Sequence, residues 1–203
     1  MKHQLFFPTS VYSVDIPSAP ELNRYLIQHI KQWKKEDSKG LVQTNQGGWH
    51  SQTNMHQRKE FRPLIDELLR MITDVATEEC YTRPLIISNM WANINYPGCY
   101  NRDHIHSNSH FSGVYYIQTP KNCGQFYMLD PRHGSNMLMP DQHPIDKIPN
   151  RLWKRVNYTP SAGRILLLPS YVYHGVNPNL STKRGEKGWR ISVSFNCLQD
   201  RFI

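Results

Sequence analysis

The chain has 203 residues, of which 38% are hydrophobic and 20% are charged, and its formal net charge is +8. This length and composition predict one globular domain with a buried core and exclude a disordered chain. No apolar run is long enough to span a membrane, and the first ten residues lack the apolar stretch of a secretory signal, so we expect a cytoplasmic protein without a membrane partner.

The charge and the cysteine content exclude further classes of protein. The excess of 24 Lys and Arg over 16 Asp and Glu makes nucleic acid or an anionic small molecule a candidate partner. No basic run exceeds four residues, which argues against nucleic acid. The four cysteines (Cys80, Cys99, Cys123 and Cys197) lie far apart without a Cys-x-x-Cys pair, which argues against a zinc ribbon and a disulfide-rich module. Nothing in these patterns indicates the oligomeric state.

The first part of the chain predicts one strand and two helices. Residues 3–16 are apolar enough for an N-terminal strand, which Pro8 interrupts. Apolar residues at helical spacing predict a helix over 19–35. A wider apolar stripe predicts a second helix over 62–80, with a proline near its start, where helices tolerate one.

After Pro84 the pattern changes to short alternating segments between turn signals, which is typical of antiparallel β structure. These segments cover residues 85–96, 110–119, 124–129, 154–158, 163–169 and 189–196. Two helices followed by six or more strands indicate an α+β, mainly β protein with a β-sandwich or jelly-roll body and helices packed on one sheet. We expect a single domain over 1–203, with the N-terminal strand and supporting helices in 1–84 and the jelly-roll core in 85–203.

Four of the ten histidines are placed like metal ligands. His104 and His106 are two residues apart in a strand-like segment, so their imidazoles are expected on one face, where they could bind one transition metal. His174 follows the leucine-rich segment 163–169 and could complete the site from the opposite edge of a barrel. His110 is a candidate for a further ligand, a hydrogen-bond partner of a ligand, or a residue without a role. Imidazole suits iron, copper, nickel and zinc, so the spacing does not select the metal.

Apolar and polar residues alternate strictly over residues 189–196. Arg190 shares one face of this segment with Ser192, Ser194 and Asn196. A guanidinium beside small hydroxyl side chains could bind a carboxylate in bidentate fashion, although an ordinary solvent-facing sheet would show the same pattern. Tyr116, in the segment 110–119, could supply a phenol to the same anion.

These motifs together resemble the Fe(II)- and 2-oxoglutarate-dependent oxygenases. Segments 98–106 and 112–117 are similar to the metal-binding half of that superfamily, and segments 169–179 and 189–196 are similar to the other half. More narrowly, the chain resembles bacterial and phage members that carry HxH, SGVYY, DPR and PS…HGV…N. The segments LFFPTSVYSVDIP and GGWHS also fit that group, so the resemblance covers nearly the whole chain.

The resemblance implies a double-stranded β-helix (jelly roll) with N-terminal helices on one sheet, and a dioxygenase, an oxidoreductase, that uses Fe(II), 2-oxoglutarate and dioxygen. Such an enzyme would hydroxylate an unknown substrate, with a prolyl or peptidyl target preferred, and release succinate and CO2. The implied metal ligands are His104, His106 and His174. Arg190 would pair with the distal carboxylate of 2-oxoglutarate, and Tyr116 would donate a hydrogen bond to it, with Ser192 in the same cosubstrate site. No catalytic residue beyond these is implied.

One departure from the superfamily lies at His106, where the usual second ligand is a carboxylate. A neutral imidazole leaves the metal site one unit more positive, which would strengthen its attraction for the 2-oxoglutarate dianion and alter the reactivity of the oxidised iron.

Two alternatives stay open. A cupin-type metal-dependent enzyme that does not use 2-oxoglutarate fits the spacing from Gly98 to His110 and from Gly163 to His174. A cupin needs no arginine for a keto acid, so Arg190 favours the oxygenase. The second alternative is a non-catalytic jelly-roll binding module, with nucleic acid as its partner.

The stretch from His133 to Pro149 contains prolines and a glycine and predicts a long loop over the mouth of the site. Just before it, Asp130 and Arg132 are interpreted as a local ion pair that fixes the end of a strand.

Overall fold

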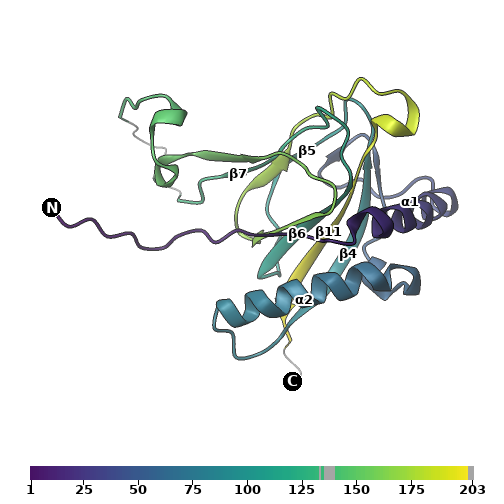
Figure 1. Ribbon diagram of the computed structural model, residues 1–203, viewed down its shortest axis with the longest axis horizontal. Coiled ribbons are helices and arrows are strands. Elements are labelled where there is room, and N and C mark those ends of the chain that lie inside the picture. The colour runs from purple at the N-terminus through teal and green to yellow at the C-terminus, as the bar shows by residue number, and fades with distance from the viewer. Residues whose placement is uncertain (133, 135–139, 201–203) are drawn as a thin grey trace.

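The computed structural model describes residues 1–132, 134 and 140–200. Two antiparallel sheets face each other, and two helices pack on the outer side of one of them (Figure 1). The six-stranded sheet contains, in spatial order, β1 (Tyr12–Asp15), β9 (Arg164–Pro169), β6 (Phe111–Gln118), β11 (Arg190–Gln199), β4 (Leu85–Asn95) and β3 (Trp49–His50). The five-stranded sheet contains β2 (Asn45–Gln46), β5 (Tyr100–His104), β10 (His174–Val176), β7 (Phe126–Leu129) and β8 (Arg155–Tyr158). The predicted mainly β class is confirmed.

Both helices cover the six-stranded sheet. Helix α1 (Ala19–Glu36) packs on β6, and helix α2 (Arg62–Glu78) packs on β4. Each begins with a proline in its first turn, where the missing N–H is not needed. The hydroxyl of Tyr115 on β6 donates to Oδ1 of Asn23 on α1 over 2.6 Å, so a buried polar contact fixes that helix to the sheet.

Alternation along the central strands separates a core face from an inner face. On β11, Ile191, Val193 and Phe195 point into the hydrophobic core beneath the helices. The intervening side chains point between the two sheets, as the sequence predicted. A smaller apolar cluster, which includes Tyr116, Leu168 and Phe126, closes the space between the sheets at one end.

The N-terminal strand is shorter than predicted. Only Tyr12–Asp15 pairs with β9, and the side chains of Leu5, Phe6 and Phe7 before it are exposed. The pairing with β9 stops at Tyr12, opposite Leu167. No helix of the described residues is long and apolar enough to cross a membrane.

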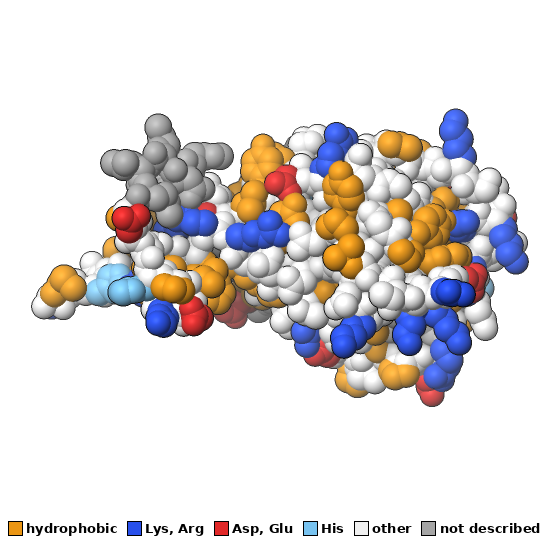
Figure 2. Space-filling view, turned by 90° about the horizontal axis from the view of Figure 1, so that it is seen from above, with side chains coloured by type: hydrophobic (Ala, Val, Ile, Leu, Met, Phe, Trp, Pro, Cys, Tyr) orange, Lys and Arg blue, Asp and Glu red, His pale blue; other side chains and the backbone are white. Residues whose placement is uncertain are grey.

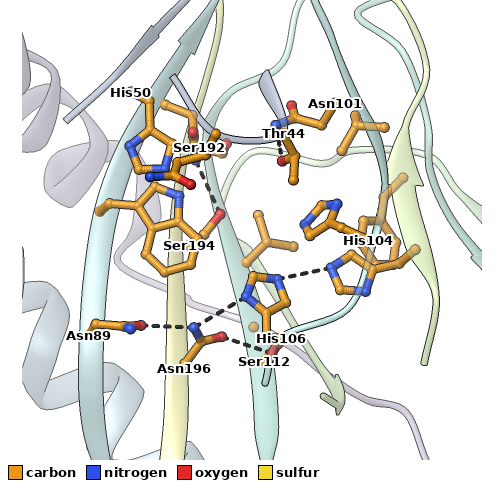
Figure 3. A pocket seen from close by; sticks show the side chains of 18 of the residues that line it. Thr44, His50, Asn89, Asn101, His104, His106, Ser112, Ser192, Ser194 and Asn196 are labelled. Atoms are coloured by element: carbon orange, nitrogen blue, oxygen red, sulfur yellow. Dashed lines mark hydrogen bonds between the residues drawn. The ribbon is translucent and has the colours of Figure 1, made fainter. Parts of the chain in front are cut away.

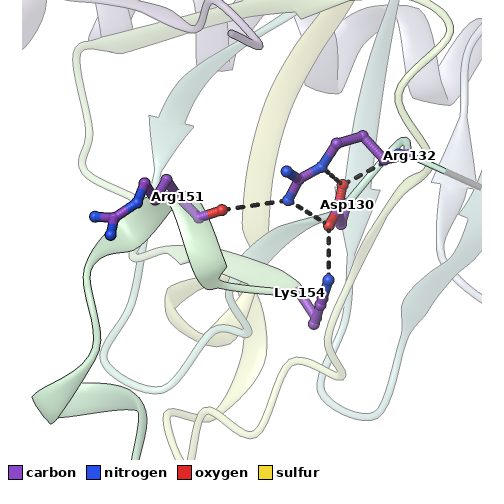
Figure 4. Close-up of polar contacts among 4 residues, drawn as sticks. All are labelled: Asp130, Arg132, Arg151 and Lys154. Atoms are coloured by element: carbon purple, nitrogen blue, oxygen red, sulfur yellow. Dashed lines mark hydrogen bonds and ion pairs between the residues drawn. The ribbon is translucent and has the colours of Figure 1, made fainter. Parts of the chain in front are cut away.

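The described part of the connection between β7 and β8 extends beyond the sheets, and ion pairs between side chains hold its base together (Figures 1 and 4). The carboxylate of Asp130 accepts hydrogen bonds from Nε and Nη2 of Arg132, both over 2.8 Å, and lies 3.3 Å from Nζ of Lys154. Arg132 also donates to the carbonyl oxygen of Arg151 over 3.2 Å. The predicted ion pair at the strand end is therefore present.

The predicted loop over residues 133–149 lies partly outside the described residues. Its described part includes a short 3-10 turn, Ile145–Lys147, and a second one, Asn150–Leu152, follows it. None of the described residues of this stretch lines the cavity between the sheets.

Candidate metal centre

The space between the sheets contains a cavity of about 330 Å³. Its floor consists of the inward-facing residues of β4, β11 and β6, which the strand register places in rows. The rows are Asn89, Asn196 and Ser112; then Trp91, Ser194 and Val114; then Asn93, Ser192 and Tyr116; and finally Asn95 with Arg190. The opposite wall carries His104, His174 and Val176 from β5 and β10.

Three of the predicted metal ligands meet in this cavity (Figure 3). His104 ends β5 and His174 begins β10, and the two residues are register partners in adjacent strands. His106 lies just beyond the end of β5 rather than within the strand that the sequence predicted. One ring nitrogen from each of the three histidines lies within 4.8 Å of the others. Among the described residues, no other group of side chains has this metal-binding arrangement.

Backbone carbonyls fix the orientation of two of these rings. Nδ1 of His104 lies 2.7 Å from the carbonyl oxygen of Arg102, and Nδ1 of His174 lies 2.8 Å from that of Val172. A carbonyl oxygen only accepts, so each Nδ1 carries the proton and each Nε2 keeps a lone pair. Such a tautomer, held by a second hydrogen bond, is the usual state of a histidine that binds a metal.

His106 is held from the six-stranded sheet. Nδ2 of Asn196 donates to Nδ1 of His106 over 3.3 Å, and Nε2 of His106 lies 3.2 Å from Nε2 of His174. The Asn196 amide also donates to Oδ1 of Asn89 over 2.8 Å and accepts from the hydroxyl of Ser112 over 2.8 Å. Two ligand nitrogens on adjacent positions of one ion, each about 2.1 Å from it, are separated by roughly 3 Å. The separation between His106 and His174 therefore fits a shared ion.

The three imidazoles are neutral near pH 7. Burial lowers the pKa of His106 to about 3, with the neighbouring His174 and His104 lowering it further. Burial and the proximity of His104 lower the pKa of His174 to about 4, and burial also lowers that of His104. Neutral imidazole is the form that binds metals, so His104 and His174 are ready to act as ligands, and His106 also needs its proton on Nδ1.

Arg190 lies at the other end of the β11 row from Asn196. It is 1% exposed, and its Nη1 donates to the carbonyl oxygen of Cys123 and lies 3.3 Å from that of Asn177. Its Nη2 is buried without a hydrogen-bond partner in the described part of the chain. A buried guanidinium nitrogen without a partner is costly, so this end of the cavity is suited to an anion.

Tyr116 and Ser192 lie beside Arg190 as predicted. The two residues are register partners on β6 and β11, and both line the cavity. Burial raises the pKa of the Tyr116 phenol, so it is a neutral hydroxyl that can donate to an anion held by Arg190. The cavity thus joins a histidine cluster that could hold a metal to an end suited to an anion, and the residues present fit Fe(II) and a carboxylate respectively.

The structure does not bring His110 into the cluster. Its side chain is exposed and lies against the ring of Tyr81, with the two ring centroids 6.5 Å apart. Its backbone N–H donates to the carbonyl oxygen of Cys197 over 2.8 Å, and its carbonyl accepts from Ser170 over 3.0 Å. These bonds turn the side chain away from the other three histidines.

Several residues that line the cavity were not assigned from the sequence, and three of them lie together. His50 and Trp91 stack on each other with ring centroids 5.4 Å apart, and Trp91 also contacts the ring of His106 at 5.8 Å. Asn93 lies next to them in the register of β3 and β4. The alternation of residues 85–96 could have placed Trp91 and Asn93 on one face. His50 had no comparable signal, because its strand has only two residues.

Comparison with known proteins identifies the family. A family model described as "Putative 2OG-Fe(II) oxygenase" matches residues 89–196, which is more than half of the chain. The chain belongs to the 2OG-Fe(II) oxygenase family. This oxygenase is therefore an oxidoreductase, and Fe(II) and 2-oxoglutarate are the cofactors typical of its family. No curated protein matches the chain.

Solved structures share the fold of this oxygenase. A prolyl-4-hydroxylase from Pseudomonas putida is 15% identical, with a TM-score of 0.65 over 95% of this chain and 94% of that one. The α-ketoglutarate-dependent carbocyclase SnoK from nogalamycin biosynthesis is 12% identical, with a TM-score of 0.67 over 94% and 80%. HygX from Streptomyces hygroscopicus, solved with nickel and 2-oxoglutarate bound, is 13% identical, with a TM-score of 0.62 over 96% and 84%. At these identities the likeness establishes the double-stranded β-helix fold.

Proposed function

We propose that this oxygenase hydroxylates an organic substrate with dioxygen and 2-oxoglutarate, releasing succinate and CO2, and that it acts in the cytoplasm. His104, His106 and His174 would hold Fe(II), which supplies the site for dioxygen activation when bound. Arg190 would bind the distal carboxylate of 2-oxoglutarate, with Tyr116 and Ser192 beside it. The observation that carries this proposal is the buried Nη2 of Arg190, which has no partner among the described residues and lies in the same cavity as the histidine cluster.

The protein's part in the reaction is to position the reactants. The backbone carbonyls of Arg102 and Val172 hold two imidazoles with Nε2 free, so these rings need no rearrangement to bind the metal. Arg190 would fix the length of the cosubstrate that the cavity accepts, because its position on β11 is set by its pairing with Asn95 on β4 and by the carbonyl oxygen of Cys123. A guanidinium matches a carboxylate in bidentate geometry and selects a dianion over a monoanion.

A prolyl or peptidyl group is the substrate that we favour. The likeness to the Pseudomonas putida prolyl-4-hydroxylase covers 94% of that chain and supports this choice. The basic character of the chain does not favour nucleic acid instead. Figure 2 shows Lys and Arg side chains scattered over the visible face among hydrophobic and acidic ones, rather than gathered into one groove.

An anaerobic titration with Fe(II) and then 2-oxoglutarate tests the proposal. The 2-oxoglutarate complex is expected to show a metal-to-ligand charge-transfer absorption band. His174→Ala should abolish the band, and Arg190→Met should keep it but need roughly 100-fold more 2-oxoglutarate, since one partner of a buried charged pair is lost.

Arg62→Met is the matched control, because Arg62 is exposed and pairs only with Asp66 on its own helix among the described contacts. This variant should titrate like the wild type. Tightly bound metal without a band would contradict the proposal and favour a cupin-type enzyme. An equal 2-oxoglutarate requirement in the wild type and Arg190→Met would remove Arg190 from the cosubstrate site.

A further inference from the structure

The cavity wall away from Arg190 is free of ionised groups. Among the described residues that line the cavity, Arg190 is the one side chain with a permanent charge, and no Asp, Glu or Lys lines it. The part lined by β3, β4, the start of β5 and the segment before β2 consists of amide, hydroxyl, imidazole and indole side chains. These residues are Gln43, Thr44, His50, Trp91, Asn93 and Asn101.

His50 presents a fixed hydrogen-bond acceptor there. Its Nδ1 lies 2.6 Å from the carbonyl oxygen of Ser51, so Nδ1 carries the proton and Nε2 keeps a lone pair. The ring lies flat on Trp91, with 10° between the planes, and it is 5% exposed. Burial lowers the pKa of His50, so the ring is neutral near pH 7. Nε2 has no protein partner among the described residues and remains accessible from the cavity.

Asn93 adds a second acceptor beside it. Asn93 is the register partner of His50 on the neighbouring strand, and its Nδ2 donates to the hydroxyl of Ser194 over 3.2 Å. The same nitrogen keeps a second N–H, and Oδ1 can accept, since no described residue donates to it. Two neighbouring acceptors without protein donors call for a ligand that brings N–H or O–H groups.

Electrostatics then selects the charge of that ligand. A cation would find no side-chain carboxylate in the cavity, and the divalent metal and Arg190 leave a net positive charge there even with the 2-oxoglutarate dianion bound. An anion would face the lone pair on Nε2 of His50, which cannot donate a hydrogen bond to it. A neutral donor avoids both costs.

We propose that the side of the cavity formed by His50, Trp91 and Asn93 binds a neutral peptide amide of the substrate, with an amide N–H donating to Nε2 of His50. The inference rests on the proposed function and deepens it, since it assigns residues that would place the target next to the metal. A peptide amide is the neutral donor that agrees with the peptidyl target proposed above, and a polyol is the competing neutral class.

Ligand-observed NMR with probes that differ only in charge tests this assignment. The protein is loaded with Zn(II), which is diamagnetic and inert to dioxygen, and with 2-oxoglutarate. The probes are the N-acetyl N-methylamides of alanine and proline, which are neutral, the corresponding N-acetyl acids, which are anionic, and the amino-acid N-methylamides, which are cationic. Methyl glucoside represents the polyols. We expect saturation-transfer signals at least fivefold stronger for the neutral amides than for any other probe.

Substitutions link that preference to the named residues. His50→Leu removes the acceptor and should reduce the signal of the neutral amides at least fivefold, whereas His50→Gln keeps an acceptor and should retain most of it. Asn93→Asp adds a negative charge and should shift the preference toward the cationic probes. His143→Leu is the matched control, since His143 is exposed and does not line the cavity, and it should change nothing.

The 2-oxoglutarate signals in the same spectra distinguish failure of this inference from failure of the proposed function. Four results, each obtained with 2-oxoglutarate bound, would overturn the inference and leave the proposed function standing. They are no binding of the amides, equal binding of probes of every charge, stronger binding of the glucoside, or unchanged binding of the amides in His50→Leu. Absence of 2-oxoglutarate binding would overturn the proposed function itself, and the inference with it.

Discussion

The two sheets form opposite walls of one cavity, but they are stabilised differently. In the six-stranded sheet, β11 pairs with β4 over ten residues and with β6 over seven, and both helices pack behind these strands. The strands of the five-stranded sheet have two to five residues each. The longer sheet carries Arg190 and Asn196, whereas the shorter one carries His104 and His174. A deep core therefore positions the anion site and the amides, while the metal site depends on short strands and local polar contacts.

Polar contacts on the outer face compensate for the short strands. The hydroxyl of Tyr127 on β7 donates to Asp103 on β5 and passes directly over Gly175 on β10, where a Cβ would lie 2.5 Å from that hydroxyl. The guanidinium of Arg155 lies 3.6 Å from the ring centroid of Tyr127 and donates to Oδ1 of Asn177 over 2.9 Å. Asp103 and Gly175 each adjoin a cluster histidine, so these contacts hold the two histidine-bearing strands side by side.

The largest expected effect comes from the core behind the six-stranded sheet. Ile72→Ala removes a fully buried side chain on α2 and should lower the free energy of unfolding by about 2–5 kcal/mol. Because α2 contacts no cluster histidine, the affinity of the folded protein for metal should stay unchanged. Chemical denaturation and a chelator-competition titration measure the two quantities. Asp74→Ala, on the exposed face of the same helix, is the control, and a parallel loss of metal affinity in Ile72→Ala would show that the two walls are not independent.

Asn196 tests the comparison between the two sheets, because it lies on the six-stranded sheet but contacts a histidine of the candidate metal site. Binding of a metal by Nε2 of His106 requires the proton on Nδ1, so the Asn196 amide must turn its oxygen toward Nδ1. Asn196→Ala should weaken metal binding about 10- to 100-fold, and Asn196→Asp should restore it, because a carboxylate accepts the same proton. Chelator competition with Co(II) measures both. Wild-type affinity in Asn196→Ala would refute this role.

A smaller effect is expected on the outer face of the shorter sheet. Tyr127→Phe removes the hydrogen bond to Asp103 while keeping the ring beneath Arg155. The loss of one hydrogen bond costs about 1 kcal/mol, so metal affinity should fall roughly fivefold, with little change in the affinity for 2-oxoglutarate once metal is saturating. Tyr158→Phe, on the neighbouring strand, serves as the control. An equal loss for the metal and for 2-oxoglutarate would mean that the two walls move together.

The smallest expected effect is a pH dependence from His50. Burial lowers its pKa in the folded state below the ordinary value of about 6.5, so below that pH the unfolded chain binds a proton that the folded chain does not. The stability of the wild type should therefore fall as the pH decreases below about 6.5. In His50→Gln this contribution is absent, and the difference in unfolding free energy between wild type and variant should change in favour of the variant between pH 7.5 and 5. A difference that does not vary with pH would show that His50 titrates normally.

The fold was predictable where the sequence repeats a regular pattern. The two helices and the six alternating segments lie within a few residues of their predicted positions, because their apolar periodicity continues for several turns or strand pairs. The short strands β2, β3 and β10 were not predicted, since two or three residues carry no periodicity. Their pairing depends on neighbours distant in the sequence.

The residues of the candidate site also fall into those that a regular sequence pattern predicted and those that it did not. Arg190, Ser192 and Asn196 were placed on one face by alternation alone, and the structure has them there. His106 joins the cluster for a reason different from the predicted one, because β5 ends at His104 and the backbone N–H of His106 is held by the carbonyl oxygen of Ser170. The sequence does not decide the role of His110, because its position depends on long-range backbone hydrogen bonds to Cys197 and Ser170.

The division of β4, β6 and β11 into a core face and a cavity face has a consequence for how such an enzyme can evolve. Each inward-facing position on these strands has neighbours on the opposite face that already satisfy the packing of the core. A lineage could therefore exchange the amides and the indole of the cavity one at a time, acquiring new substrates through surface-like substitutions on an inherited scaffold, while the histidine cluster and Arg190 stay in place.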